Sequence, residues 1–152
     1  MAGIMFILSG ISLAGQPNDW ENPAVFARNQ TESHATVIPY EKETPALKDQ
    51  VANSPWYHSL SGYWKFTWSQ TPAKAPGEFY EPGYQDEGWR EIPVPSNWQM
   101  HGYGRVHYRN VDHVIPSDPP NIPEDYNPVG SYRKVFHIPD NWEQREVYLH
   151  FE

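Results

Sequence analysis

Large aromatic residues alternate with polar ones in the run YWKFTW at residues 63–68. Successive side chains of a β-strand point to opposite faces of its sheet, so Trp64, Phe66 and Trp68 would share one face. Aromatic and β-branched residues are also enriched in strands. The sequence therefore predicts a strand over 63–68 with one bulky aromatic face.

Three further runs, at 89–94, 131–138 and 145–152, show the same period of two. The last run, REVYLHFE, is the most regular, with Val, Leu and Phe at every second position. A short helical turn is expected at 44–51. Short strands separated by Pro-Gly and Asp-Asn turns are typical of sandwiches and jelly rolls. The predicted fold class is all-β, a β-sandwich of the jelly-roll type.

The sequence divides into three predicted parts. Residues 1–15 are a signal peptide or an apolar tail, 16–45 are an N-terminal arm of weak periodicity, and 46–152 are the jelly-roll domain. The chain stops directly after the run at 145–152, which would leave a sheet edge uncovered. We therefore expect a jelly roll that is truncated at its C-terminal end, as a fragment of a longer protein.

The apolar N-terminus leaves the compartment open. It is too short to span a bilayer, which takes about 20 residues. Ser12, Leu13 and Ala14 resemble a signal cleavage site, but no Lys or Arg precedes the apolar run. A signal peptide would place the protein in the periplasm or outside the cell, and its absence would place it in the cytoplasm.

Composition excludes several function classes. The formal net charge is -8 and no Lys/Arg cluster is present, which argues against nucleic-acid binding. The chain has no cysteine, so disulfides, thiolate zinc sites and a cysteine nucleophile are excluded. Sixteen prolines disfavour long helices. We expect neither nucleic acid nor a membrane as a partner.

Residues for catalysis on this chain alone are hard to find. A glycosidase needs two opposed carboxylates, and no pair among the loop candidates is placed so by its spacing. Those candidates are Asp112, Asp118, Glu124 and Asp125. His101, His107 and His113 recur every six residues, which does not match helical ligand spacing, and glycines interrupt any regular strand. Solvated loop charges and surface histidines are the preferred interpretations.

The stretch VPSNWQMHGYGRVHYRNV at 94–111 suits a sugar better than it suits any other ligand. Aromatic rings stack on the apolar faces of sugars, and amides bind neighbouring hydroxyls. Composition alone nevertheless favours a packing role for its aromatic residues. We expect a bracing role for Pro93, Pro95, Trp98 and Gln99, a cis bond between Pro119 and Pro120, and a turn at Gly130.

Several long motifs resemble the N-terminal part of the large β-galactosidases of glycoside hydrolase family 2. They are DWENPAVFARNQ, SLSGYWKFTW, IPVPSNWQMHGYGRVHYRNV, DPPNIPEDYNPVGSYRKVFHIPDNW and REVYLHFE, in this order from residue 19 onward. The resemblance implies a jelly-roll, galactose-binding-like sugar-binding domain that is followed by immunoglobulin-like domains and a TIM barrel. The two catalytic glutamates of the family belong to the barrel, so this chain contains no catalytic residue.

The resemblance also implies site residues. In the family, the Asn of a Tyr-x-Asn-Val segment contacts the galactosyl group, and its match is Asn110. The Asp-Trp-Glu-Asn-Pro segment supplies ligands to a divalent metal, matched by Asp19, Asn22 and the backbone of Val25. Such oxygen ligands suit Mg²⁺ or Ca²⁺, and Na⁺ is a further candidate in the full-length enzyme. We expect no tight metal binding by this chain alone. The segment Gly-Arg-Val at 104–106 departs from the family pattern.

Three functions follow as hypotheses. The first is the N-terminal sugar-binding domain of a β-galactosidase that hydrolyses terminal non-reducing β-D-galactose residues by a retaining mechanism, inactive as a fragment. The second is a free-standing carbohydrate-binding module, and the third is a subunit-assembly segment. The expected partners are a β-galactoside sugar, the remaining domains of the enzyme and further copies in a homo-oligomer.

Overall fold

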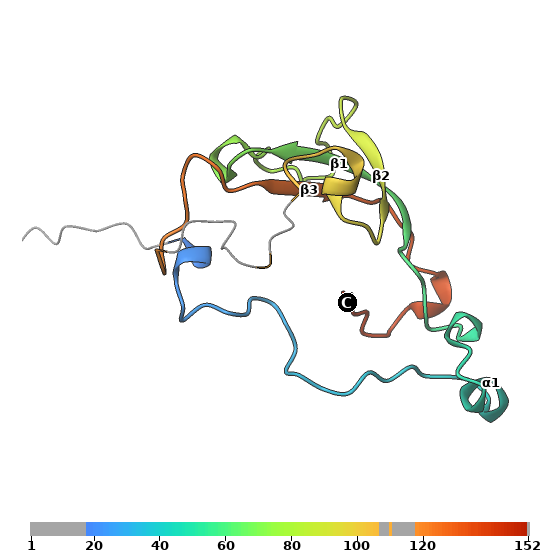
Figure 1. Ribbon diagram of the computed structural model, residues 1–152. Coiled ribbons are helices and arrows are strands. Elements are labelled where there is room, and N and C mark those ends of the chain that lie inside the picture. Colours follow the sequence, from blue (N-terminus) through green and yellow to red (C-terminus); the bar gives the residue numbers. More distant parts are fainter. Residues whose placement is uncertain (1–17, 107–109, 111–117, 152) are drawn as a thin grey trace, which may run out of the picture.

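The computed structural model describes residues 18–106, 110 and 118–151. Its centre is a three-stranded antiparallel sheet in the order β2-β1-β3 (Figure 1). The strands are β1 (Gly62–Ser69), β2 (Arg90–Val94) and β3 (Val129–Arg133). The all-β class is confirmed, and the predicted strands at 63–68 and 89–94 are both present. The described residues form this one sheet and little helix.

Strand register explains which side chains form the core. β1 pairs with β2 from Gly62↔Val94 to Phe66↔Arg90, and Trp64 opposes Ile92 within that ladder. Residues that oppose each other directly point to the same face of a sheet. Phe66 and Ile92 are 1% and 2% exposed, so the predicted aromatic face of β1 is the buried one.

Aromatic rings from later segments cover Phe66. Tyr103 lies edge-on at 4.8 Å between ring centroids, and Tyr132 of β3 lies at 4.8 Å. Trp98, at the start of the 3-10 helix η4 (Trp98–His101), packs at 6.1 Å. The expected bracing role of Trp98 is therefore confirmed, because its ring closes the core beside Phe66.

Gly130 does not form the turn that the sequence predicts before the third strand. It lies inside β3, opposite Trp68. A Cβ atom at this position would lie 2.5 Å from the Trp98 ring and 2.8 Å from Phe66. The glycine is required by the close approach of these rings, which come from distant parts of the sequence.

Ion pairs stabilise the packing against the other face of the sheet. Lys65 and Arg133 are register partners on β1 and β3. Asp86 accepts hydrogen bonds from both, with Oδ1 bound to Lys65 Nζ and Oδ2 to Arg133 Nη1. Arg133 also donates to the Tyr84 carbonyl at 3.2 Å. These bonds fasten the loop at 70–89 against the sheet.

Two strand predictions at the C-terminal end are wrong in whole or in part. β3 ends at Arg133 rather than at residue 138, because its ladder with β1 stops at Lys65↔Arg133. Residues 145–151 form no strand. The exposed fractions of Val147, Leu149 and Phe151 are 40%, 59% and 76%. The alternating pattern marks an amphipathic segment, but no strand of the described residues forms a ladder with it.

Short helical turns connect the remaining segments. The helical turn predicted at 44–51 is present as α1 (Glu43–Leu47) with the 3-10 helix η2 (Val51–Asn53) close behind. The 3-10 helices η1 (Asp19–Glu21), η3 (Pro72–Lys74) and η5 (Asp140–Trp142) complete the set. The peptide bond between Pro119 and Pro120 is cis as expected, and so is the bond between Val94 and Pro95.

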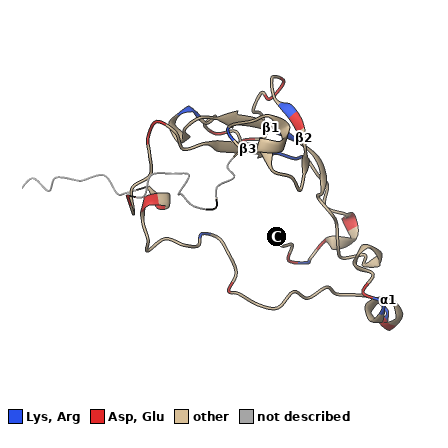
Figure 2. Ribbon diagram, viewed as in Figure 1, with Lys and Arg blue, Asp and Glu red and all other residues tan. Residues whose placement is uncertain are grey.

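Charge and hydropathy agree with the sequence analysis over the described residues. Lys and Arg are scattered along the chain rather than gathered on one face (Figure 2). Within the described segments, no helix has the length and apolarity that a membrane crossing requires. The predicted signal peptide or tail at 1–15 lies outside the described residues, so both interpretations stay predictions.

Candidate functional site

Asn110, the predicted sugar contact, is exposed and lies at a bend in the chain. It is the one described residue between 106 and 118. Its sequence neighbours His107, Asp112 and His113 fall outside the described residues. An exposed side-chain amide offers two hydrogen-bond donors and one acceptor oxygen to a ligand, and the predicted role requires such groups.

The chain that leads to Asn110 rests on a platform of two aromatic residues. Gly104 has a φ of +69°, and a Cβ atom there would lie 3.3 Å from Trp68 Nε1 and 3.5 Å from Tyr126 Oη. The left-handed φ and this close approach both favour glycine. The Arg105 guanidinium lies over the Tyr126 ring at 5.0 Å. The platform fixes the direction in which the chain leaves the core.

The two polar atoms of the platform are unusual because they are buried and unpaired. Trp68 Nε1 and Tyr126 Oη have no hydrogen-bond partner among the described residues. Buried polar atoms normally find a partner, since leaving one unmatched costs about 1–3 kcal/mol. The loop around Gly104 thus packs against two polar atoms, Trp68 Nε1 and Tyr126 Oη, without forming a hydrogen bond to either.

The N-terminal arm reaches the same side of the molecule. Figure 1 shows η1 (blue) beside the segment that begins at residue 118 (orange). Glu21 Oε1 accepts a hydrogen bond from the Ile122 backbone N–H at 3.3 Å. Further along, Gln70 Nε2 donates to the Asp125 carbonyl at 2.9 Å, and the Asn127 N–H donates to the Gln70 carbonyl at 3.1 Å. The arm and the end of β1 are therefore both tied to the segment at 118–128.

The predicted metal ligands are already engaged within the chain. Both carboxylate oxygens of Asp19 contact the Arg28 guanidinium. The hydrogen bond from Arg28 lowers the pKa of Asp19, with the charge of Arg28 adding to it. Asn22 Oδ1 accepts from the Ala24 N–H at 3.1 Å, and the Val25 N–H donates to the Asn22 carbonyl. In this arrangement Arg28 occupies the carboxylate that a divalent ion would bind, and the ligand assignment stays a prediction.

The other candidates from the sequence gain no catalytic geometry. Asp118 Oδ2 accepts from Asn121 Nδ2 at 3.1 Å within its own turn. His101 Nε2 lies 3.0 Å from Ser96 Oγ. Over residues 18–106, 110 and 118–151, no three His, Asp or Glu side chains gather to hold a metal ion.

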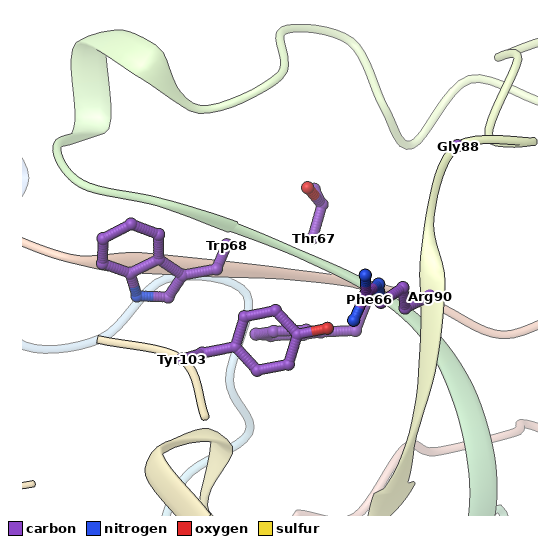
Figure 3. A pocket seen from close by; sticks show the side chains of 6 residues that line it. All are labelled: Phe66, Thr67, Trp68, Gly88, Arg90 and Tyr103. Atoms are coloured by element: carbon purple, nitrogen blue, oxygen red, sulfur yellow. The ribbon is translucent and has the colours of Figure 1, made fainter. Parts of the chain in front are cut away.

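A hollow of about 230 Å³ lies beside the platform, and the sequence analysis missed it (Figure 3). It is lined by Phe66, Thr67, Trp68, Gly88, Arg90 and Tyr103. Trp68 belongs to both the hollow and the platform. A signal was present in the sequence, because Arg90 stands two residues before Ile92 and so points to the same face of the strand, although Arg90 itself is exposed.

Comparison with known proteins identifies the domain. Residues 57–152 match the sequence model of the "Glycosyl hydrolases family 2, sugar binding domain". The chain is 34% identical to a beta-galactosidase of Priestia megaterium over 91% of its length and 14% of that protein. It is 39% identical to a beta-galactosidase of Halalkalibacterium halodurans over 84% of its length and 13% of that protein.

A third relative agrees. The chain is 39% identical to beta-galactosidase 2 of Enterobacter cloacae over 83% of its length, which corresponds to 12% of that protein. The chain thus spans about an eighth of the curated relatives that it matches. The matched residues include all three strands, the platform and Asn110, and the chain belongs to family 2 of the glycosyl hydrolases, whose sugar-binding domain it carries at residues 57–152.

Proposed function

We propose that this chain serves as the first domain of a β-galactosidase that hydrolyses terminal non-reducing β-D-galactose residues. The observation that carries the proposal is the match of residues 57–152 to the family's sugar-binding domain, together with relatives that are named beta-galactosidases. The chain alone is inactive in this proposal, because a glycosidase needs two catalytic carboxylates and, in the family, these belong to the TIM barrel rather than to the sugar-binding domain.

The domain contributes a wall of the active site through Asn110. Its exposed amide binds a galactosyl hydroxyl and holds the sugar in the geometry that the catalytic groups require. Positioning groups affect rate strongly, because small misplacements of a substrate are costly. The platform of Trp68 and Tyr126 supports this role, because it fixes the position of Gly104, six residues before Asn110.

The arm stabilises the position of the following segments in this proposal. The hydrogen bond from the Ile122 N–H to Glu21 Oε1 ties η1 to the segment that follows Asn110 in the sequence. A Mg²⁺ or Ca²⁺ ion bound by Asp19 and Asn22 would supply further rigidity and local positive charge, but would first have to displace Arg28. The remaining domains of the enzyme and further copies of it are the proposed protein partners.

Activity assays on two proteins test the proposal. The full-length enzyme that carries this domain should cleave an aryl β-D-galactoside much faster than the matching β-D-glucoside, and proton NMR should show a first-formed product of retained β configuration. The 152-residue chain should show no cleavage. A full-length enzyme that prefers the glucoside, or inverts the anomeric centre, would contradict the proposal.

A further inference from the structure

The hollow at the start of β2 has the properties of a ligand site. Pairing between β1 and β2 stops at Phe66↔Arg90, whereas pairing between β1 and β3 continues to Ser69↔Val129. Beyond Phe66, β1 therefore has no strand beside it on the β2 side among the described residues, and the hollow lies at this point.

Arg90 is the charged group of this hollow, and its side chain has no partner among the described residues. The other described arginines each lie against a carboxylate or an aromatic ring. These are Arg28 on Asp19, Arg105 on Tyr126, Arg133 on Asp86 and Arg145 on Trp56. The exposed Arg90 side chain makes no ion pair, hydrogen bond or ring contact in the described part of the chain. A planar guanidinium with free donors matches the two oxygens of a carboxylate.

Aromatic rings form the rest of the wall. Figure 3 shows Tyr103 between Trp68 and Arg90, with its hydroxyl directed toward the nitrogen atoms of Arg90. The Tyr103 ring is fixed by its edge contact with Phe66 at 4.8 Å. Rings of this kind offer a flat apolar surface together with a polar handle. The hollow thus joins a ring-binding surface to an anion-binding group.

We propose that this hollow binds a sugar residue that carries a carboxylate, a uronic acid, with its ring against Tyr103 and Trp68 and its carboxylate on Arg90. The volume of about 230 Å³ is below the roughly 300 Å³ at which sites for larger ligands begin, which limits the occupant to one sugar ring. The Tyr103 hydroxyl binds a ring hydroxyl. The site is separate in its chemistry from the neutral galactosyl contact proposed for Asn110.

Calorimetric titration of the 152-residue chain tests the site without any activity measurement. The probes are sodium D-galacturonate, methyl β-D-galactoside as the neutral ring, and sodium acetate as the carboxylate without a ring. D-galacturonate should bind about tenfold or more tightly than either control probe, since the charge-assisted pair and the ring contact act together. Equal binding of acetate would show an adventitious anion only and would overturn the proposal.

Two variants probe the site from different directions. Arg90→Gln should weaken D-galacturonate binding about tenfold to a hundredfold, the loss expected for one charge-assisted contact. Gly88→Leu places a larger side chain at a residue that lines the hollow and should weaken binding. A Cβ atom at Gly88 meets nothing within 4 Å, so the substitution causes no clash. Lys74→Gln removes the same charge from η3, outside the hollow, and should leave binding unchanged.

A control for folding separates loss of the site from loss of the fold. Near-ultraviolet circular dichroism establishes that each variant keeps the aromatic packing of the wild-type chain. If Arg90→Gln unfolds the chain, the Gly88→Leu variant still decides the question. Undetectable D-galacturonate binding by the wild-type chain overturns the proposal, as does binding that survives both substitutions. Neither result bears on the β-galactosidase assays, because the titration uses no galactoside cleavage.

Discussion

Gly130 lies directly against the indole ring of Trp98, so that a Cβ atom built on the glycine would be 2.5 Å from ring carbons Cε3 and Cζ3. Atoms this close must separate, and Phe66, 2.8 Å from the same Cβ position, blocks one direction of relief. The contact joins β3 to η4 across the core of the sheet. It is the tightest constraint on a glycine among the described residues.

Gly130→Ala is therefore expected to destabilise the chain. Overpacking of a core costs about 1–3 kcal/mol, and here both neighbours are rings that are themselves packed. Urea denaturation measures the free energy of unfolding. Gly77→Ala is the matched control, because a Cβ atom at Gly77 meets nothing within 4 Å. Equal free energies of unfolding for both variants would show that the Trp98 contact is not tight.

Asp86 should make the stability of the chain depend on acid. Its pKa is lowered chiefly by the hydrogen bond from Lys65, with Arg133 contributing further. A carboxylate with a lower pKa in the folded state stabilises that state above its unfolded pKa of about 3.9, and the stabilisation is lost as the pH falls through the folded value.

Asp86→Asn tests this dependence. The variant should be less stable than the wild-type chain at pH 7, and the difference should shrink as the pH is lowered below about 4. Urea midpoints at a series of pH values measure it. Asp125→Asn is the control, because only the backbone carbonyl of Asp125 has a described partner, Gln70. A difference between Asp86→Asn and wild type that is constant with pH would contradict the electrostatic account.

The Tyr126 hydroxyl offers a test of the platform. It is buried without a partner among the described residues, and Tyr126→Phe removes only that oxygen. We expect the variant to be as stable as the wild-type chain or up to about 1 kcal/mol more stable, because an unmatched buried group is lost. Tyr148→Phe serves as the control, since its hydroxyl is exposed and donates to Glu146. A clear loss of stability in Tyr126→Phe alone would show that the hydroxyl has a partner, such as an ordered water.

Arg28 should compete with metal ions for Asp19. Arg28→Gln removes the guanidinium that contacts both carboxylate oxygens. If the arm holds a divalent ion, Arg28→Gln should bind Mg²⁺ or Ca²⁺ more tightly than the wild-type chain, as measured by calorimetry. Arg145→Gln removes the same charge far from η1 in the sequence and is the control. No gain in affinity would remove Asp19 from the predicted ligand set.

The local parts of the fold could be predicted from the sequence. The period of two in YWKFTW identified β1 and its buried face, and Phe66 is the most buried large side chain. The glycines at 102 and 104 indicated a turn, and both have positive φ. Such features depend on neighbours within a few residues, which a single sequence displays.

Features that depend on distant residues could not be predicted in the same way. Gly130 next to a strand pattern indicated a turn, because nothing in the sequence shows that Trp98 packs on it. The run at 145–152 has a strong alternating pattern, but pattern does not supply the partner that a strand needs. Arg28 lies nine residues from Asp19 in an arm without periodicity, so their ion pair left no signal.

The most direct test of the account is the effect of Asn110→Ala on kcat/KM of the full-length enzyme for a β-D-galactoside. If Asn110 binds the galactosyl group, kcat/KM should fall by about tenfold or more, equivalent to the loss of one substrate hydrogen bond near 1.4 kcal/mol. Asn121→Ala, which removes an exposed amide bound within its own turn, should leave kcat/KM unchanged. Unchanged kinetics for Asn110→Ala would contradict the role of this domain as a wall of the active site.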